Sequence, residues 1–119
     1  MRRGRLAKAE EFAAAAATVH ELADEARDVS DAYVTLCVHA GIAAADAICA
    51  ARLGRYSRGE SHEEAAALLA TVDKSYARHL QTLLGLKTRA GYSHQRSTLQ
   101  NALRAGRAMD ALMTAARSI

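Results

Sequence analysis

The absence of proline from an alanine-rich chain is the feature that most narrows what this sequence can fold into. Of the 119 residues, 29 are Ala, none is Pro, and only 4% are aromatic. Alanine has the highest intrinsic helix propensity and proline the lowest, whereas β-sheets favour aromatic and β-branched side chains. Half of the residues are hydrophobic, which is too many for a disordered chain. We therefore predict an all-α protein.

The length and the apolar periodicity predict one domain, residues 1–119, with the architecture of a compact up-and-down bundle of four to five helices. No linker or internal repeat divides the chain. The helices are expected over Leu6–Arg27 and Asp31–Leu53, from a capping box at 61–64 to Val72, through a stretch from Tyr76 to Leu86, and from a second capping box at 97–100 to the C-terminal region. Periodicity fails over 87–96.

The cysteine and histidine pattern bears on compartment and cofactors. Cys37 and Cys49 fall in one predicted helix, about 18 Å apart along its axis, which is too far for a disulfide. Free thiols suit a reducing interior, so we expect a cytoplasmic protein. The histidines lack metal-ligand spacing, and we expect no metal and no cofactor. Lys8, Glu10 and Glu11 interrupt the approach to the apolar run of the first helix, so we interpret this helix as amphipathic rather than as a signal peptide. We also expect no membrane segment, because no stretch approaches about 20 strongly apolar residues.

Charge is divided unevenly along the chain. Residues 1–5 carry +3, residues 6–73 carry −7 and residues 74–119 carry +7. This division is compatible with a basic face for phosphates or for an acidic protein partner. It is equally compatible with two halves that neutralise each other, within one chain or across a dimer.

The segment between the last two predicted long helices carries the chemistry of greatest interest. Arg89 offers a permanent planar charge for a phosphate, and His94 offers a proton donor or acceptor near neutral pH. These are the two chemical groups needed for RNA cleavage without a metal: the imidazole deprotonates the 2′-OH or protonates the leaving oxygen, and the guanidinium stabilises the charge of the phosphorane. Lys87 and Arg96 would add phosphate contacts, and Tyr92 would stack on a base. The alternative is structural: Arg89 caps a helix and His94 lies in the loop.

The spacing of Arg89 and His94 resembles the signature of HEPN domains, in which four to six residues separate an Arg from a His near the junction of the last two core helices. The stretch from His39 to Asp46, and Ser61-His-Glu-Glu-Ala65 with the leucines after it, also look like HEPN bundles. The resemblance covers residues 30–116. It implies a homodimer whose two motifs meet, acting as a metal-independent endoribonuclease, often the toxin of a toxin–antitoxin pair. It equally implies a non-catalytic interaction or nucleotide-binding module, with an antitoxin or a nucleotidyltransferase as partner protein.

One acidic residue stands inside an otherwise apolar stretch. Asp46 lies within the run from Ile42 to Ala51, and a buried carboxylate needs a partner. We hypothesise that Asp46 pairs with Arg89 or Lys87 and so orients the motif segment. The alternative is that Asp46 lies on a solvated stripe of its helix.

Overall fold

The other helices pack around the apolar helix α2 (Ser30–Leu53), which lies at the centre of the bundle. The computed structural model describes residues 2–22, 30–57, 61–92 and 97–119, with only the backbone for 88–92. In the second half of α2, every residue from Ala43 to Ala50 is buried except Asp46. Small side chains dominate this stretch and let neighbouring helices approach closely. Gly54, at a φ of 72°, ends the helix with its N–H on the Ala50 carbonyl.

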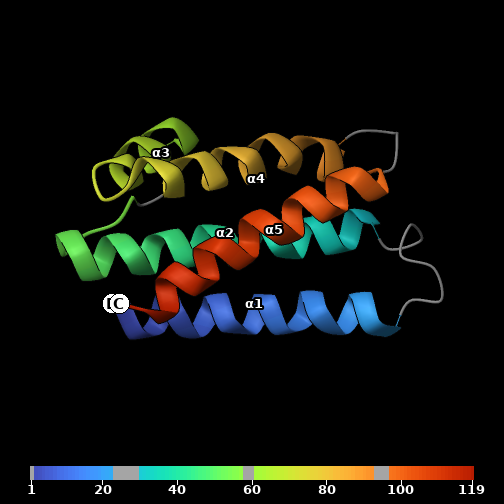
Figure 1. Cartoon of the computed structure of the whole chain (residues 1–119), viewed down its shortest axis with the longest axis horizontal. Helices are drawn as coiled ribbons and strands as arrows, with labels where there is room; N and C mark the ends of the chain where they lie inside the picture. Colours follow the sequence, from blue (N-terminus) through green and yellow to red (C-terminus); the bar gives the residue numbers. More distant parts are fainter. Residues whose placement is uncertain (1, 23–29, 58–60, 93–96) are drawn as a thin grey trace.

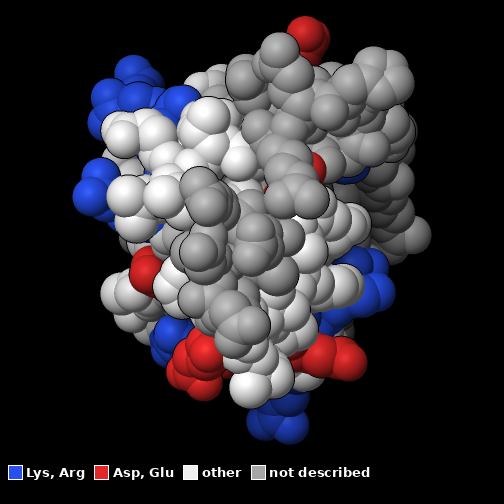
Figure 2. All heavy atoms as spheres, turned by 90° about the vertical axis from the view of Figure 1, so that its right-hand side faces the viewer, with Lys and Arg blue, Asp and Glu red and all other residues white. Residues whose placement is uncertain are grey.

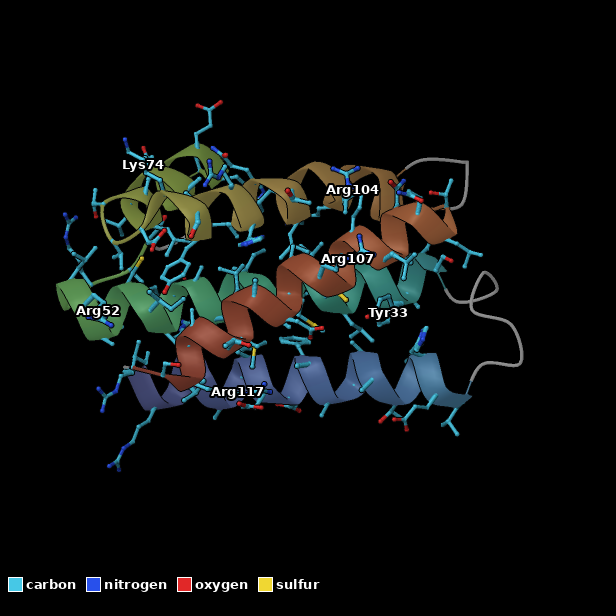
Figure 3. The ribbon with its side chains drawn as sticks, viewed as in Figure 1. Tyr33, Arg52, Lys74, Arg104, Arg107 and Arg117 are labelled. Atoms are coloured by element: carbon cyan, nitrogen blue, oxygen red, sulfur yellow. The ribbon has the colours of Figure 1, made fainter. Side chains whose placement is uncertain are left out.

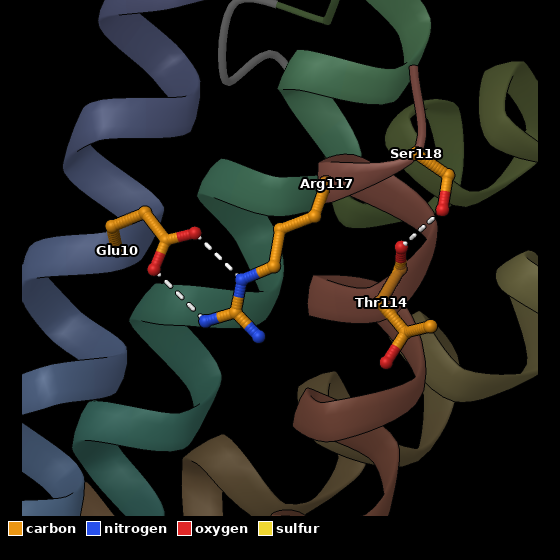
Figure 4. A network of polar contacts seen from close by, with 4 residues as sticks. All are labelled: Glu10, Thr114, Arg117 and Ser118. Atoms are coloured by element: carbon orange, nitrogen blue, oxygen red, sulfur yellow. Dashed lines mark hydrogen bonds and ion pairs between the residues drawn. The ribbon is translucent and has the colours of Figure 1, made fainter.

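Helix α1 (Arg2–Leu22) runs antiparallel along one side of α2 (Figure 1). Its fully buried residues, Ala9 and Ala16, are two helical turns apart and form part of the core. On the outside, the Arg117 guanidinium of α5 donates to both carboxylate oxygens of Glu10 at 2.7 and 2.8 Å (Figure 4). An ion pair therefore joins the first helix to the last.

Helices α3 (His62–Ala70) and α4 (Lys74–Tyr92) cover the opposite side of α2. Ser61 caps α3, since its hydroxyl accepts from the Glu64 N–H at 2.9 Å, as the first capping box predicts. The Asp73 carboxylate accepts from the N–H of Ser75 at 2.7 Å and so caps α4. The break between the two helices falls close to the predicted gap between Val72 and Tyr76.

Helix α5 (Leu99–Arg117) runs diagonally in Figure 1 from beside the C-terminal end of α4, across α2, towards the start of α1, and completes the bundle. Within the described residues all regular structure is helical, so the prediction of an all-α up-and-down bundle is confirmed. The bundle measures 42 × 24 × 21 Å.

Several predicted helix boundaries differ from the structure, by one or two residues at the start of α2 and α4 and at the end of α3. α1 begins at Arg2 rather than Leu6, and 23–27 lie outside the described residues. α4 continues to Tyr92, past Leu86, where the apolar periodicity of the sequence ends. The second capping box at 97–100 is wrong: the cap of α5 is Thr98, whose hydroxyl accepts from the Asn101 N–H at 3.0 Å.

The expectation that no stretch approaches a membrane span is also wrong for one helix. Within the described residues, α2 is long and apolar enough to cross a membrane, with a mean hydropathy of 1.7 over its best window. In the bundle, 67% of that window is buried. The core helix of a folded domain meets the same criteria of length and composition.

Candidate functional site

The predicted motif segment begins in the last two turns of α4. Lys87 is half-buried there, and the backbone of Arg89 and Tyr92 is helical up to the end of α4. The side chains of Arg89 and Tyr92, and His94 and Arg96 entirely, lie outside the described residues. Their predicted roles therefore stay predictions.

The chain that leaves the motif segment is attached to the start of α2. The backbone N–H of Ser97 donates to the Asp31 carboxylate at 2.7 Å, across 66 residues of sequence. Thr98 then caps α5. These contacts fix the entry into α5 beside the first turn of α2.

Arginine side chains lie exposed on the N-terminal half of α5, which follows the motif segment. Arg104 and Arg107 are both exposed and carried by this half of the helix (Figure 3). Figure 2, which faces the end of the bundle where α4 and α5 meet, shows Lys and Arg side chains at the upper left and also at the right and the bottom, with acidic side chains at the top and along the lower part. The described part of this end therefore carries charges of both signs.

Asp46 does not pair with Lys87. Its carboxylate forms an ion pair with Arg5 of α1, at 4.0 Å, and its side chain is 14% exposed. Beside Asp46, α4 presents Leu80 and Leu84 rather than Lys87. The side chain of Arg89, the other expected partner, lies outside the described residues, so that pairing stays a prediction. Burial raises the pKa of Asp46 to about 6, and the opposing charge of Arg5 lowers it only in part.

Asp46 lines a cavity of about 520 Å³ between α1, α2, α3 and α4. Its polar lining comes from α1, α2, the segment after α2 and the start of α3. These polar residues are Arg5, Asp46, Cys49, Tyr56, Ser57, Ser61 and His62. The remaining walls are apolar, from Ile42, Ala45, Ala65, Leu80 and Leu84.

Two polar groups of this cavity are joined to each other. Arg5 Nη2 donates to the hydroxyl of Tyr56 at 3.0 Å, and the guanidinium carbon lies 4.6 Å from the centre of the Tyr56 ring. The Ser57 hydroxyl, in contrast, is buried without a hydrogen-bond partner in the described part of the chain. The cavity thus contains the Arg5 guanidinium, which a hydrogen bond holds in place, and two groups that lack hydrogen-bond partners among the described residues, the Asp46 carboxylate and the Ser57 hydroxyl.

Sequence reasoning found Asp46 but missed the residues around it. Arg5 was counted only as N-terminal charge, and Tyr56, Ser57 and His62 belong to segments interpreted as a loop and a cap. A carboxylate inside an apolar helix was the available signal. Its ion-pair partner lies 41 residues earlier in the chain, and the other polar residues of the cavity lie 10 to 16 residues later, so only the packing of the helices shows that they are close.

The two cysteines are free and buried, as predicted. Burial raises the pKa of the Cys37 thiol to about 12 and that of Cys49 to about 11. Burial thus favours the protonated thiols near neutral pH, and a protonated thiol is a poor nucleophile. Within the described residues, no group of three His, Cys, Asp or Glu side chains could hold a metal ion.

A second cavity, of about 350 Å³, lies where α1, α2 and α5 meet. Tyr33, labelled in Figure 3, forms part of its wall, together with Leu99 and Leu103 of α5. These two leucines are 50% and 56% exposed, an unusual state for large apolar side chains on neighbouring helical turns.

Comparison with known proteins adds no family. No protein-family model matches the chain, and no curated protein or solved structure does so either. What can be inferred about function therefore depends on the residues and on the geometry described above.

Proposed function

We propose that the chain is a HEPN-like RNA-binding protein of the cytoplasm, acting as a homodimer that cleaves RNA without a metal. The supporting observation is the place of the motif: Arg89 falls in the last turn of α4, and His94 follows directly after that helix, between the two long helices α4 and α5. The exposed arginines of α5 lie just beyond and would extend a phosphate-binding surface.

The chemistry follows from the two motif side chains. His94 takes the proton of the attacking 2′-OH or returns one to the leaving 5′-oxygen, and Arg89 stabilises the charge on the phosphorane. Lys87 and Arg96 hold neighbouring phosphates, and Tyr92 stacks on a base. Cleavage by this route ends in a 2′,3′-cyclic phosphate, and a protein of this activity suits the toxin of a toxin–antitoxin pair.

The test is RNA cleavage by purified protein in EDTA. We expect cleavage to persist with the chelator and to fall by about 100-fold or more in His94→Ala and Arg89→Ala. The matched controls are His20→Ala and Arg78→Ala, both exposed residues outside the segment 87–96. The proposal fails if the protein leaves varied RNAs uncut and unbound at low salt.

The exposed apolar cavity on α5 favours a second candidate function, a non-catalytic module that binds a partner protein such as an antitoxin or a nucleotidyltransferase. Leu99 and Leu103 would enter that interface. The two candidates differ in their effect on cells: expression of a toxin arrests growth, and Arg89→Ala relieves the arrest. A module is silent on expression, and Leu103→Glu abolishes its complex with the protein encoded beside it.

A further inference from the structure

The cavity around Asp46 has the dimensions and the lining of a small-molecule site. Its volume of about 520 Å³ lies within the range of roughly 300–1,000 Å³ found for ligand pockets. Four helices contribute to its walls, and Leu80, Leu84 and Ile42 give them an apolar surface. A few polar groups on apolar walls are what such sites use to orient a ligand.

The Asp46 carboxylate lacks hydrogen bonds from the described part of the protein. Arg5 Nη1 approaches only to 4.0 Å, beyond hydrogen-bond distance, while Arg5 Nη2 donates to Tyr56. Because the Asp46 side chain is 14% exposed and lines the cavity, its carboxylate accepts its hydrogen bonds from molecules in the cavity. A molecule that displaces water there has to bring N–H or O–H groups of its own.

The Ser57 hydroxyl is a second polar group of the cavity that lacks hydrogen bonds to the described residues. Its Oγ is buried and has no partner among the described residues, and it lines the same cavity. A hydroxyl both donates and accepts, so it suits a ligand edge on which donors and acceptors alternate.

The charge of the cavity selects between ligands that carry N–H donors. Arg5 already places a guanidinium near Asp46, and the two formal charges cancel. A cationic amine or amidine would lie next to Arg5 and be repelled by it, whereas a neutral donor edge would not. Among the standard nucleobases, guanine alone presents two adjacent N–H donors, N1–H and N2–H₂, which match the two oxygens of a carboxylate.

We propose that this cavity binds a guanine base, whose N1–H and N2–H₂ donate to the two carboxylate oxygens of Asp46 while its flat faces lie on the apolar walls. Arg5 and His62, at the polar side of the cavity, are placed for the sugar or the phosphate. The guanine comes from a free nucleoside or nucleotide, or from a guanosine within RNA. None of these residues belongs to the Arg89–His94 segment, so the site is independent of the proposed cleavage.

Calorimetric titration of the full chain with nucleosides tests the proposal. We expect guanosine to bind, inosine, which lacks the N2 amine, to bind about tenfold more weakly, and adenosine to show no binding in the same range. Asp46→Asn keeps the shape of the side chain but not its paired acceptors, and guanosine affinity should fall about tenfold or more. Asp110→Asn, an exposed carboxylate at the other cavity, is the matched control and should leave the affinity unchanged.

A second variant guards against a folding defect in the first. Ser57→Ala removes only a hydroxyl and should weaken guanosine binding several-fold. Circular dichroism establishes that both variants are folded. Equal affinity of the wild type and of folded Asp46→Asn for guanosine overturns the proposal, as does equal binding of guanosine and adenosine. Asp46-dependent binding of benzamidine without binding of guanosine overturns it too, because the occupant is then a cation.

Further arms identify the source of the base and separate this site from the cleavage motif. Guanosine monophosphate and the oligonucleotides UUGUU and UUAUU are compared under the same conditions. Tighter binding of UUGUU than of the mononucleotide indicates a guanosine in RNA, and the reverse order indicates a free nucleotide. His94→Ala should bind guanosine as the wild type does. If this variant loses RNA cleavage but keeps guanosine binding, the guanine site stands apart from the cleavage motif. If it loses guanosine binding, the guanine site is not independent of the motif, and the proposal is contradicted on that point.

Discussion

Asp46 is the one residue between Ala43 and Ala50 that is not fully buried, and its charge is held at a cost in stability. Dehydration outweighs the attraction of Arg5, which is why the pKa is raised to about 6 from its ordinary 3.8. An apolar or neutral side chain would suit this position better on grounds of stability alone. A charge kept in an unfavourable place at the wall of a cavity is a common sign of a functional group.

Replacement of Asp46 by Asn should therefore stabilise the protein at neutral pH, by about 1–3 kcal/mol. The sign follows from proton binding: with the raised pKa, the folded state holds its proton more tightly than the unfolded state. The wild type accordingly loses stability, relative to the variant, as the pH rises from 3.8 to about 6. Urea denaturation of both proteins across this range measures the difference, which should be near zero at the acid end. A difference that does not change with pH contradicts the assignment.

The same protonation should control guanosine binding. The charged or titratable groups that face Asp46 are Arg5 from α1, Cys49 from α2, and Tyr56 and His62 from the segments that follow, while α4 contributes leucines. Because a protonated carboxyl loses an acceptor, guanosine affinity should fall as the pH drops below about 6. Titrations at several pH values check this, and affinity that rises towards acid pH argues against the carboxylate as the receptor of the base.

The thiols of Cys37 and Cys49 should react slowly with alkylating and disulfide reagents in the native protein. Burial raises both pKa values, to about 12 and about 11, so the reactive thiolate is scarce and inaccessible. Labelling with a coloured disulfide reagent should be complete in denaturant and slower by at least about 100-fold without it. Rapid labelling of the native protein would show that α2 is less well covered than the structure indicates.

For the individual helices, sequence patterns predicted the positions along the chain well, but they predicted poorly which residues of different helices contact each other. Ser61 and Asp73 could be recognised because a cap is a local feature, set by side chains within three residues of the helix start. Thr98 was missed in favour of Ser97, whose N–H instead donates to Asp31 from the start of α2. A contact across 66 residues decides this detail, and local sequence carries no trace of it.

Two glycines that look alike in sequence should respond oppositely to the same substitution. At Gly41 a methyl group would collide with Leu83 of α4, whereas at Gly85 it would meet nothing within 4 Å. Gly41→Ala should therefore cost about 1–3 kcal/mol through overpacking. Gly85→Ala should stabilise α4 by about 0.5–1 kcal/mol through its helix propensity. Thermal or urea denaturation measures both, and a destabilising Gly85→Ala would contradict the open space beside that residue.

At the scale of the whole molecule, α1 covers a helix that is apolar enough to span a membrane. The apolar composition of α2 is plain from the sequence. That α1 packs over α2 could not be predicted, because α1 is only weakly amphipathic and the residues it buries are alanines. The candidate site depends on the same packing: α1 brings Arg5 to Asp46, and α3 and α4 close the remaining sides. The polar cavity therefore forms only when the helices pack together, whereas the Arg89–His94 spacing can be recognised in a single stretch of sequence.

Two substitutions in α1, compared with a control at an exposed position of the same helix, decide whether packing or charge holds α1 in place. Ala16→Glu puts a carboxylate at a fully buried point of α1 and should cost several kcal/mol, about 3 or more. Glu10→Gln removes the ion pair to Arg117, whose partners are 44% and 53% exposed, and should cost about 1 kcal/mol or less. Ala14→Glu, at an exposed point of the same helix, should change little. Urea denaturation orders the three variants; equal losses in Ala16→Glu and Glu10→Gln would mean that the ion pair, and not the alanine face, fixes the helix that carries Arg5 into the cavity.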